Sequence, residues 1–328
     1  MMATIYGALA IVMWGALALL GVNTKAIPAF QLLFMCFFIS ALLMFVRRFL
    51  IGQPLLCKPA MTLPQWLLGT GALFGFHFCY FIALKHAPAI AVSLICYFWP
   101  MLLAILLAGK ATRLRALAGG IIGFIGIGFI ILGDGEISFN AEFVLGYVLA
   151  GACALIWSSY SWYLSRFGGE LDNIGWLSLA VALLSLAAHF LLESPLSGGL
   201  SSSSRVFGLW QFDGEQWLGI ILLGLGPVGG AFYLWDLGLK KGNSQLLASM
   251  SFCSPLISSV LLALAGYNAW SMNILIALAL ILLGALIANK KPANNKPADK
   301  KQLHQAKAAD SQANKALAVK AERIGPVS

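Results

Sequence analysis

Aromatic and polar side chains recur inside long apolar stretches of this sequence, where they are suited to binding a solute. His77 and Tyr80 lie three residues apart, so a helix places them on one face. Phe232 and Trp235 repeat this spacing 155 residues later. Aromatic faces hold a flat apolar ring by stacking, and they attract an ammonium group through the ring quadrupole. The candidate substrate-binding residues are Trp14, His77, Tyr80, Tyr97, Trp99, Trp157, Ser158, Trp162, Phe232 and Trp235.

Two interpretations stay open for these rings. Interfacial belts of membrane proteins also enrich Trp and Tyr, and Trp162, which lies four residues before Arg166, fits such a belt. Five others lie too deep in their apolar stretches for a belt, so they either pack in a core or line a pocket: Trp14, Tyr80, Tyr97, Trp99 and Trp157. An aromatic or large neutral amino acid suits a pocket of this composition. A carrier of phosphates or nucleotide sugars would need several inward Arg or Lys residues, and these stretches offer almost none.

Ionisable side chains deep in the apolar stretches are costly, and only His77 and Asp236 qualify. Asp236 lies four residues before Lys240, which predicts an ion pair on one helix with the lysine reaching toward water. We interpret His77 as a hydrogen-bonded core histidine in preference to a proton-handling group. The scarcity of buried carboxylates favours uncoupled or exchange transport, because coupling to protons or sodium usually needs a titrating or coordinating group in the membrane. We expect neither a cofactor nor a metal site.

The apolar stretches themselves must be membrane spans. Of the 328 residues, 60% are apolar and 10% charged, so the chain cannot cover a water-soluble surface with polar side chains. Apolar runs of 18 or more residues recur, and each of these is long enough to cross a hydrocarbon core as a helix, whereas a β-barrel would show short alternating segments. The second and last stretches are the shortest, which leaves a count of nine open. We predict an all-α membrane protein of ten transmembrane helices, with nine as the alternative. The predicted spans are residues 3–20, 30–46, 66–84, 88–109, 115–133, 142–164, 174–192, 217–239, 244–266 and 274–288.

The positions of Lys and Arg predict the orientation and argue against nucleic acid as a partner. With the N-terminus in the cytoplasm, the inside loops hold nine basic residues before the tail, and the outside loops hold only Lys25, Lys85 and Arg205. The net charge of +9 is concentrated in the tail, since nine of the 21 basic residues fall in the final 39. We predict a bacterial inner-membrane protein with both termini cytoplasmic. The inside residues are Arg47, Arg48, Lys58, Lys110, Arg113, Arg115, Arg166, Lys240 and Lys241.

The sequence also contains two related halves. A shift of 143 residues places Trp14 on Trp157. Because each half holds five spans, an odd number, the second half must enter the membrane from the opposite side. We predict a first five-helix repeat at 1–138, a second at 139–289 and a basic cytoplasmic tail without fixed structure at 290–328. A shift of 155 residues places Gly69, Gly71, Gly75, Lys85 and Pro100 on Gly224, Gly226, Gly230, Lys240 and Pro255.

Pro100 and Pro255 are candidate hinges, because proline inside a helix removes one hydrogen bond and kinks the rod. Two inverted halves enclose a site near the middle of the membrane, and rocking one against the other opens that site alternately to each side. A static kink, tolerated because neighbouring helices satisfy the freed carbonyls, is the alternative.

The arrangement resembles the drug/metabolite transporter superfamily in its EamA-type branch of ten spans. The residues that carry this resemblance are Trp14-Gly15, Trp157-Ser158, the glycine-rich fifth span and the basic C-terminal end. The run Tyr97-Phe98-Trp99-Pro100, with Tyr80 one span earlier, is similar to the YddG-type aromatic amino acid exporters. That similarity implies export of aromatic and other neutral amino acids through an aromatic-lined central cavity.

Other classes of protein fit less well. The sequence lacks HExxH, GxSxG and GxxxxGK[ST] motifs, which argues against a membrane hydrolase and an ATP-driven pump. It offers no repeated ring of charges or carbonyls for a channel. Export of other small metabolites or cationic drugs remains an alternative, as does a membrane scaffold without transport activity. As partners we expect a small solute and the lipid bilayer, with the chain a monomer or a weak homodimer.

Overall fold

The computed structural model describes residues 2–132, 141–167, 169–193, 210–267 and 271–290. Residues Met1–Lys290 form one compact unit. The predicted boundary between the halves, at 138 and 139, and the predicted tail from 291 onward lie outside the described residues.

Each described regular element is a helix, as the apolar stretches predict. Nine helical segments of the described residues are long and apolar enough to cross a membrane, and the bent pair α12–α13 makes a tenth if it counts as one span. This confirms the predicted all-α membrane protein of nine or ten spans. In chain order the elements are α1 Met2–Leu20, η1 Val22–Thr24, α2 Ala29–Leu50, α3 Leu63–His86, α4 Ala89–Cys96, α5 Trp99–Leu107, α6 Arg113–Leu132, η2 Ala141–Phe143, α7 Val144–Arg166, α8 Asp172–Leu192, α10 Gly214–Leu225, α11 Gly230–Lys241, α12 Ser244–Met250, α13 Cys253–Leu264 and α14 Met272–Asn289.

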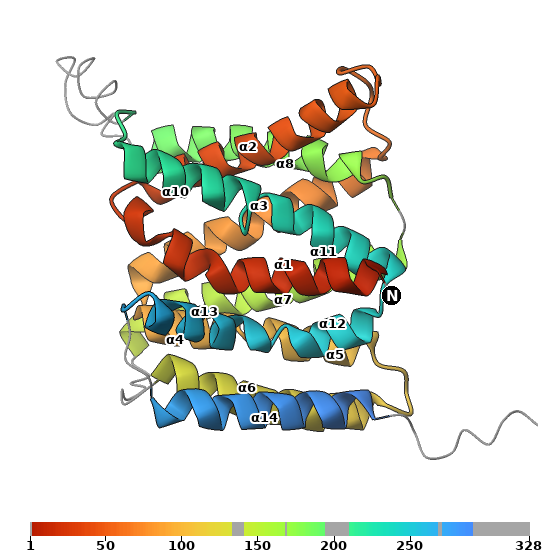
Figure 1. Cartoon of the computed structure of the whole chain (residues 1–328), viewed down its shortest axis with the longest axis vertical. Helices are drawn as coiled ribbons and strands as arrows, with labels where there is room; N and C mark the ends of the chain where they lie inside the picture. Colours follow the sequence, from red (N-terminus) through yellow and green to blue (C-terminus); the bar gives the residue numbers. More distant parts are fainter. Residues whose placement is uncertain (1, 133–140, 168, 194–209, 268–270, 291–328) are drawn as a thin grey trace, which may run out of the picture. The chain divides into compact units, whose positions relative to one another are not determined.

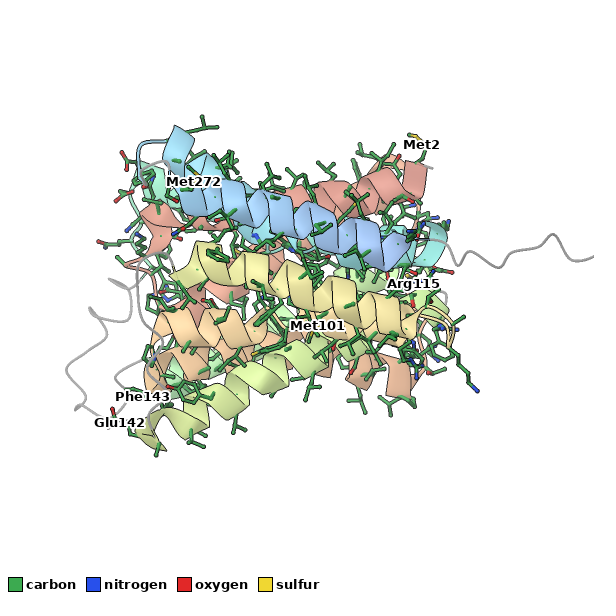
Figure 2. The ribbon with its side chains drawn as sticks, turned by 90° about the horizontal axis from the view of Figure 1, so that it is seen from below. Met2, Met101, Arg115, Glu142, Phe143 and Met272 are labelled. Carbon is green, nitrogen blue, oxygen red and sulfur yellow. The ribbon has the colours of Figure 1, made fainter. Side chains whose placement is uncertain are left out.

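The spans run back and forth between two faces of the bundle. We call the end at which α1 begins the N-terminal face and the other end the opposite face. Figure 2 shows Met2 and Arg115 at the first of these, and Glu142 and Met272 at the second. α1 lies between α11 and α13 in the middle of the bundle, and it packs extensively on both (Figure 1).

Two spans break close to a proline. α4 ends at Cys96 and α5 begins at Trp99, while α12 ends at Met250 and α13 begins at Cys253 with a bend of 42°. The first break precedes Pro100 and the second precedes Pro255. Proline cannot donate to the carbonyl four residues earlier, and the freed carbonyl of Ser251 instead accepts from the Ser254 amide at 3.2 Å. The two breaks lie about 155 residues apart, which is the offset of the predicted repeat.

A third break separates α10 from α11 and was not anticipated from the sequence. The chain leaves the helix at Gly226 and resumes it at Gly230, with Pro227 between them. At Gly229 an added Cβ would collide with the carbonyl oxygen of Gly224, so a residue with a side chain does not fit there. The Gly-Pro pair is a signal for a break that the hydropathy of the span conceals.

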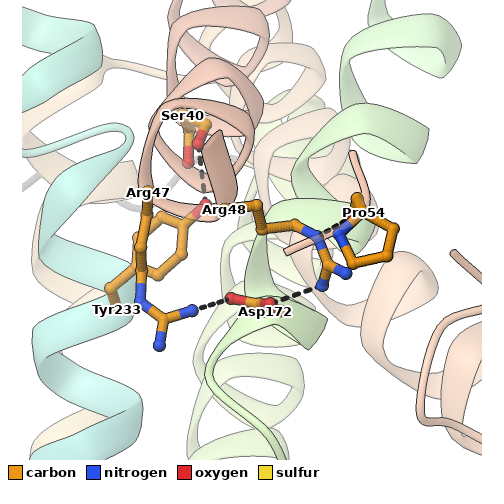
Figure 3. Close-up of polar contacts among 6 residues, drawn as sticks. All are labelled: Ser40, Arg47, Arg48, Pro54, Asp172 and Tyr233. Atoms are coloured by element: carbon orange, nitrogen blue, oxygen red, sulfur yellow. Dashed lines mark hydrogen bonds and ion pairs between the residues drawn. The ribbon is translucent and has the colours of Figure 1, made fainter. Parts of the chain in front are cut away.

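At the N-terminal face, a carboxylate on α8 joins the two helices of the α2–α8 pair. Asp172 accepts from Arg47 at 2.6 Å through Oδ1 and from Arg48 at 2.7 Å through Oδ2 (Figure 3). The Arg48 side chain is only 8% exposed, and its Nε also donates to the Pro54 carbonyl at 2.7 Å. A buried guanidinium therefore has its charge and two of its five N–H donors matched within the chain.

The same helix pair is joined at its middle and at the opposite face. The hydroxyls of Ser40 and Ser178 lie 2.9 Å apart, both buried. Glu193, just beyond α8, accepts from the Phe30 amide at 3.0 Å and the Gln31 amide at 3.3 Å, which are in the first turn of α2. A carboxylate is favoured there by the helix dipole and by the unpaired amides of the first turn. α8 thus holds α2 at both ends.

Four of the five glycines of the fifth span serve packing within the chain: Gly119, Gly120, Gly123 and Gly126. An added Cβ at Gly119 would collide with the carbonyl oxygen of Gly284 on α14, and one at Gly284 would collide with that of Gly119. Small residues therefore let α6 and α14 approach closely. Met101 of α5 fills the space beside Gly120 and lies next to α6 in Figure 2.

We predict that Asp172→Asn destabilises the fold by about 3 kcal/mol, because it leaves the buried Arg48 guanidinium without its counter-charge. Arg47 is 47% exposed, so Arg47→Gln should cost less than about 1 kcal/mol. The midpoint of thermal unfolding in detergent compares the two variants. Equal shifts would show that Asp172 does not owe its role to the buried arginine.

Candidate functional site

Five of the candidate rings meet at the centre of the bundle. Trp14 of α1 lies 6.2 Å from Trp99 of α5, 5.7 Å from Trp157 of α7, and 6.2 and 5.1 Å from Phe232 and Trp235 of α11, measured between ring centroids. Most of these contacts are edge-to-face or tilted, which are favoured geometries for aromatic pairs. We call these five residues the Trp14 cluster. It joins four helices from both predicted halves.

Hydrogen bonds fix two of the indoles in place. The Trp14 Nε1–H donates to the carbonyl of Pro227 at 3.0 Å, in the break between α10 and α11. The Trp235 Nε1–H donates to the Ser161 hydroxyl at 3.1 Å. Trp235 is fully buried, and Trp14 is only partly buried. The cluster therefore has rings of fixed orientation, because buried indole donors rarely go without an acceptor.

His77 lies at the edge of this cluster. Its ring centroid is 6.2 Å from Phe232, 5.4 Å from Phe37 and 5.2 Å from Phe76. Its Nδ1 lies 2.7 Å from the Leu73 carbonyl one turn earlier, which agrees with a hydrogen-bonded histidine. The face of α3 that the sequence predicted to bind a solute therefore places His77 among aromatic rings.

Tyr80 and Tyr97 lie on the side of the cluster toward the opposite face. Phe76 stacks on Tyr80 at 6.3 Å and contacts Trp157 at 5.9 Å, so it connects Tyr80 with the cluster. The Tyr97 hydroxyl lies next to Ser254 at the start of α13.

Tyr97 also lines a cavity of about 290 Å³ between α4, α6 and α13. Hydroxyl groups and aliphatic side chains share its wall, and the candidate hinge Pro255 is part of it. Because the lining includes the first residues of α4 and the last residues of α6, the cavity lies toward the opposite face. The lining residues are Ala89, Ile90, Ser93, Tyr97, Ile130, Ile131, Pro255, Ser258 and Ser259.

Two candidates of the sixth span lie apart from these features. Trp162 lies under the Arg166 guanidinium, whose Cζ is 5.8 Å from the ring centroid. This position near the N-terminal face fits the interfacial interpretation of Trp162. Ser158 is buried, and its hydroxyl donates to the Leu155 carbonyl of its own helix at 3.2 Å. Of the two tryptophans proposed for this span, the structure places Trp157 in the Trp14 cluster.

Asp236 and Lys240 pair as the sequence predicts, but the pair is more buried than expected. Lys240 Nζ lies 2.7 Å from Asp236 Oδ2 and donates to the Gly169 carbonyl at 3.3 Å. The lysine side chain is only 11% exposed, so it does not reach out toward water. The sequence could not show this, because the acceptor belongs to the loop between α7 and α8.

Known proteins resemble this chain over most of its length. The aromatic amino acid exporter YddG of Ancylobacter novellus is 38% identical over 295 residues, which cover 88% of this chain and 96% of the exporter. The aromatic amino acid exporter YddG of Salmonella typhimurium is 28% identical over 279 residues, covering 80% and 88%. A solved crystal structure with 37% identity matches with a TM-score of 0.77, covering 87% of this chain and 97% of its own. No protein-family model matches the chain.

We predict that Trp14→Phe lowers the free energy of unfolding by about 1 kcal/mol more than Trp99→Phe does. Both changes shrink a ring of the cluster, but only the first leaves the buried Pro227 carbonyl without its donor. Thermal unfolding midpoints of the two variants test this. Equal midpoints would show that the Pro227 carbonyl finds another partner.

Proposed function

Since this chain belongs to the family of the YddG aromatic amino acid exporters, we propose that it exports aromatic and other neutral amino acids across the bacterial inner membrane by alternating access. The observation that carries this proposal is the Trp14 cluster, in which four helices from both halves place aromatic rings around one point. An aromatic side chain gains stacking energy at such a point, and no fixed charge in it rejects a neutral solute.

The cavity at Tyr97 supports the same function. Its volume of about 290 Å³ is at the lower end of the range for small-molecule sites, which suits a solute the size of an amino acid. Hydroxyls of Ser93, Ser258 and Ser259 supply polar groups beside an apolar wall. We infer that the cavity is the outer part of the transport pathway and that the Trp14 cluster is its floor.

The pattern of helix contacts supports two inverted repeats. We count α4–α5, α10–α11 and α12–α13 as single spans. Span one is then α1 and span six is α7, so a repeat pairs each of the first five spans with the span five positions later. This pairing relates the α1–α11 interface to the α7–α3 interface. It likewise relates α1–α13 to the contacts of α7 with α4 and α5. The large α2–α8 and α6–α14 interfaces map onto themselves. Such pairing is what a pseudo-twofold axis produces, and it favours placing the chain in the EamA-type branch of the drug/metabolite transporters.

The distribution of charge supports the orientation. The ion pairs of Asp172 and Asp236 lie at the N-terminal face, together with most of the basic loop residues before the tail. The excess of Lys and Arg marks this face as cytoplasmic, with both termini inside. The cavity then faces the outside, and the cytoplasmic face is held closed by polar contacts. In alternating access this is the outward-facing state.

Breaks at matching positions in both halves favour Pro100 and Pro255 as the hinges that move between the outward-facing and inward-facing states. The break before Pro255 adjoins the cavity, so a change in the 42° bend would alter its width. We propose uncoupled or exchange transport, because the polar lining of the cavity consists of hydroxyls and the buried carboxylate of Asp236 is neutralised by Lys240, so neither offers a free proton-carrying group. A single chain contains the whole pathway, so a monomer suffices and a weak homodimer is not needed for transport.

Counterflow in proteoliposomes tests this function. Labelled phenylalanine and methionine should exchange into vesicles loaded with unlabelled phenylalanine, with threonine slower, and an imposed pH gradient should leave the rates unchanged. Counterflow of a quaternary ammonium compound without any amino acid would favour a drug exporter, since aromatic rings also hold such cations. Absence of all counterflow would favour the scaffold alternative.

A matched pair of variants tests the Trp14 cluster as the binding site. Trp157→Ala removes a ring of the cluster, and Trp162→Ala removes the same side chain five residues later on α7, outside the cluster. Losing one stacking contact of about 1 kcal/mol should raise the phenylalanine concentration for half-maximal transport roughly fivefold in Trp157→Ala. That concentration should stay unchanged in Trp162→Ala. If both variants weaken it equally, the cluster is packing and not a binding site.

A further inference from the structure

The Asp236–Lys240 pair is unusual because it lies between the aromatic cluster and the N-terminal face. Asp236 directly follows Trp235 of the cluster, and Lys240 lies one helical turn further along α11. Tyr160 of α7 contacts Trp157 at 6.2 Å between ring centroids and is close enough to Asp236 to interact electrostatically. Asp236 thus adjoins a ring that we propose to hold the solute, and Lys240 lies about one turn beyond it on the same helix.

One oxygen of this carboxylate is left unpaired. Oδ2 takes the bond from Lys240, while in the described part of the chain the buried Oδ1 has no hydrogen-bond partner. The Asp236 side chain is only 2% exposed. A buried carboxylate oxygen without a donor is costly, so this position has unused capacity to accept a hydrogen bond from a cationic group.

Lys240 ties the pair to a second element. Its Nζ also donates to the Gly169 carbonyl in the loop between α7 and α8. The ammonium therefore links α11 to that loop at the N-terminal face, beneath the cluster. Releasing it would free both the ammonium and the carboxylate, side by side, on the cytoplasmic side of the rings.

We propose that Asp236 and Lys240 are the charged groups that recognise the two ends of an amino acid zwitterion as it enters from the cytoplasm. The ammonium of the solute binds Asp236 and its carboxylate binds Lys240, while its side chain reaches the Trp14 cluster. The zwitterion replaces the internal ion pair by two ion pairs of the same kind, so no charge is left uncompensated in the membrane. The inference rests on the proposed function and specifies how that site selects its substrates.

The other ion cluster of this face lacks these properties. Asp172 is shared by Arg47 and Arg48, which leaves a surplus positive charge, and both of its oxygens are bonded. It also joins α2 to α8 and not the helices of the Trp14 cluster. Of the ion pairs at the N-terminal face in the described residues, the Asp236–Lys240 pair is the one with balanced charges for a zwitterion.

Three solutes that share a phenyl ring separate the two charges. Phenylalanine carries both, 3-phenylpropionate lacks the ammonium, and 2-phenylethylamine lacks the carboxylate. In proteoliposomes the wild type should prefer phenylalanine to each analogue by at least about tenfold. Asp236→Asn should lose most phenylalanine counterflow and gain 3-phenylpropionate, because Lys240 is then free for a carboxylate. Lys240→Gln should instead gain 2-phenylethylamine.

Two further variants guard against a purely structural explanation. Asp236→Asn combined with Lys240→Gln leaves no unpaired charge, and it should fold and transport with its preference for phenylalanine reduced about tenfold. Asp172→Asn should lower thermal stability yet keep the wild-type preference among the three solutes. Unchanged preference in a transporting Asp236 or Lys240 variant would overturn the inference while leaving amino acid transport intact. A wild type that moves no amino acid would instead overturn the proposed function.

Discussion

The hydrogen bond from the Trp14 indole to the Pro227 carbonyl connects the two features on which the centre of this protein depends. Lipid offers no partner for a backbone carbonyl, so a break inside a span is tolerated only where the protein supplies one. Pro227 lies in such a break, between α10 and α11, and Trp14 supplies the donor at 3.0 Å. The same bond fixes the ring around which the other aromatic side chains gather. The broken helix and the aromatic centre are therefore parts of one arrangement.

The fixed and adaptable parts of the bundle are separated in a consistent way. Interfaces that map onto themselves in the proposed repeat are made from unbroken helices with close contacts: Asp172 and Glu193 hold α2 to α8 at both ends, and Gly119 and Gly284 bring α6 against α14. The broken spans instead contribute α4 and α13 to the wall of the cavity, and α5 and α11 to the Trp14 cluster. A packed interface resists deformation, whereas a break needs only a few backbone dihedral changes to alter its angle. Bending at the breaks therefore changes the site, while the α2–α8 and α6–α14 interfaces beside it stay rigid.

The sequence predicted the spans well, because lipid as a solvent imposes a long apolar run on each helix. It also predicted which ring types occupy the centre. It kept both Trp157 and Trp162 as candidates, because depth alone favours Trp157 and the neighbours that separate the two come from other helices. The break at Pro227 had a local signal in its Gly-Pro pair. The Glu193 cap had none, since a carboxylate at the end of a span is ordinary and its target amides on α2 lie 163 residues away. The burial of Lys240 likewise depends on Gly169, which belongs to another segment.

Aromatic rings alone do not explain how an amino acid is distinguished from other solutes with a phenyl group. A ring face attracts a quaternary ammonium as well as a phenyl side chain, so the Trp14 cluster selects for shape and apolar surface but weakly for charge. A fixed single charge beside it would favour cations or anions, and it would be costly in the membrane when no solute is bound. A carboxylate and an ammonium that neutralise each other avoid this cost, since their net charge is zero both before and after a zwitterion replaces the internal pair. Selection by charge and stability of the empty site are then compatible in the same two side chains.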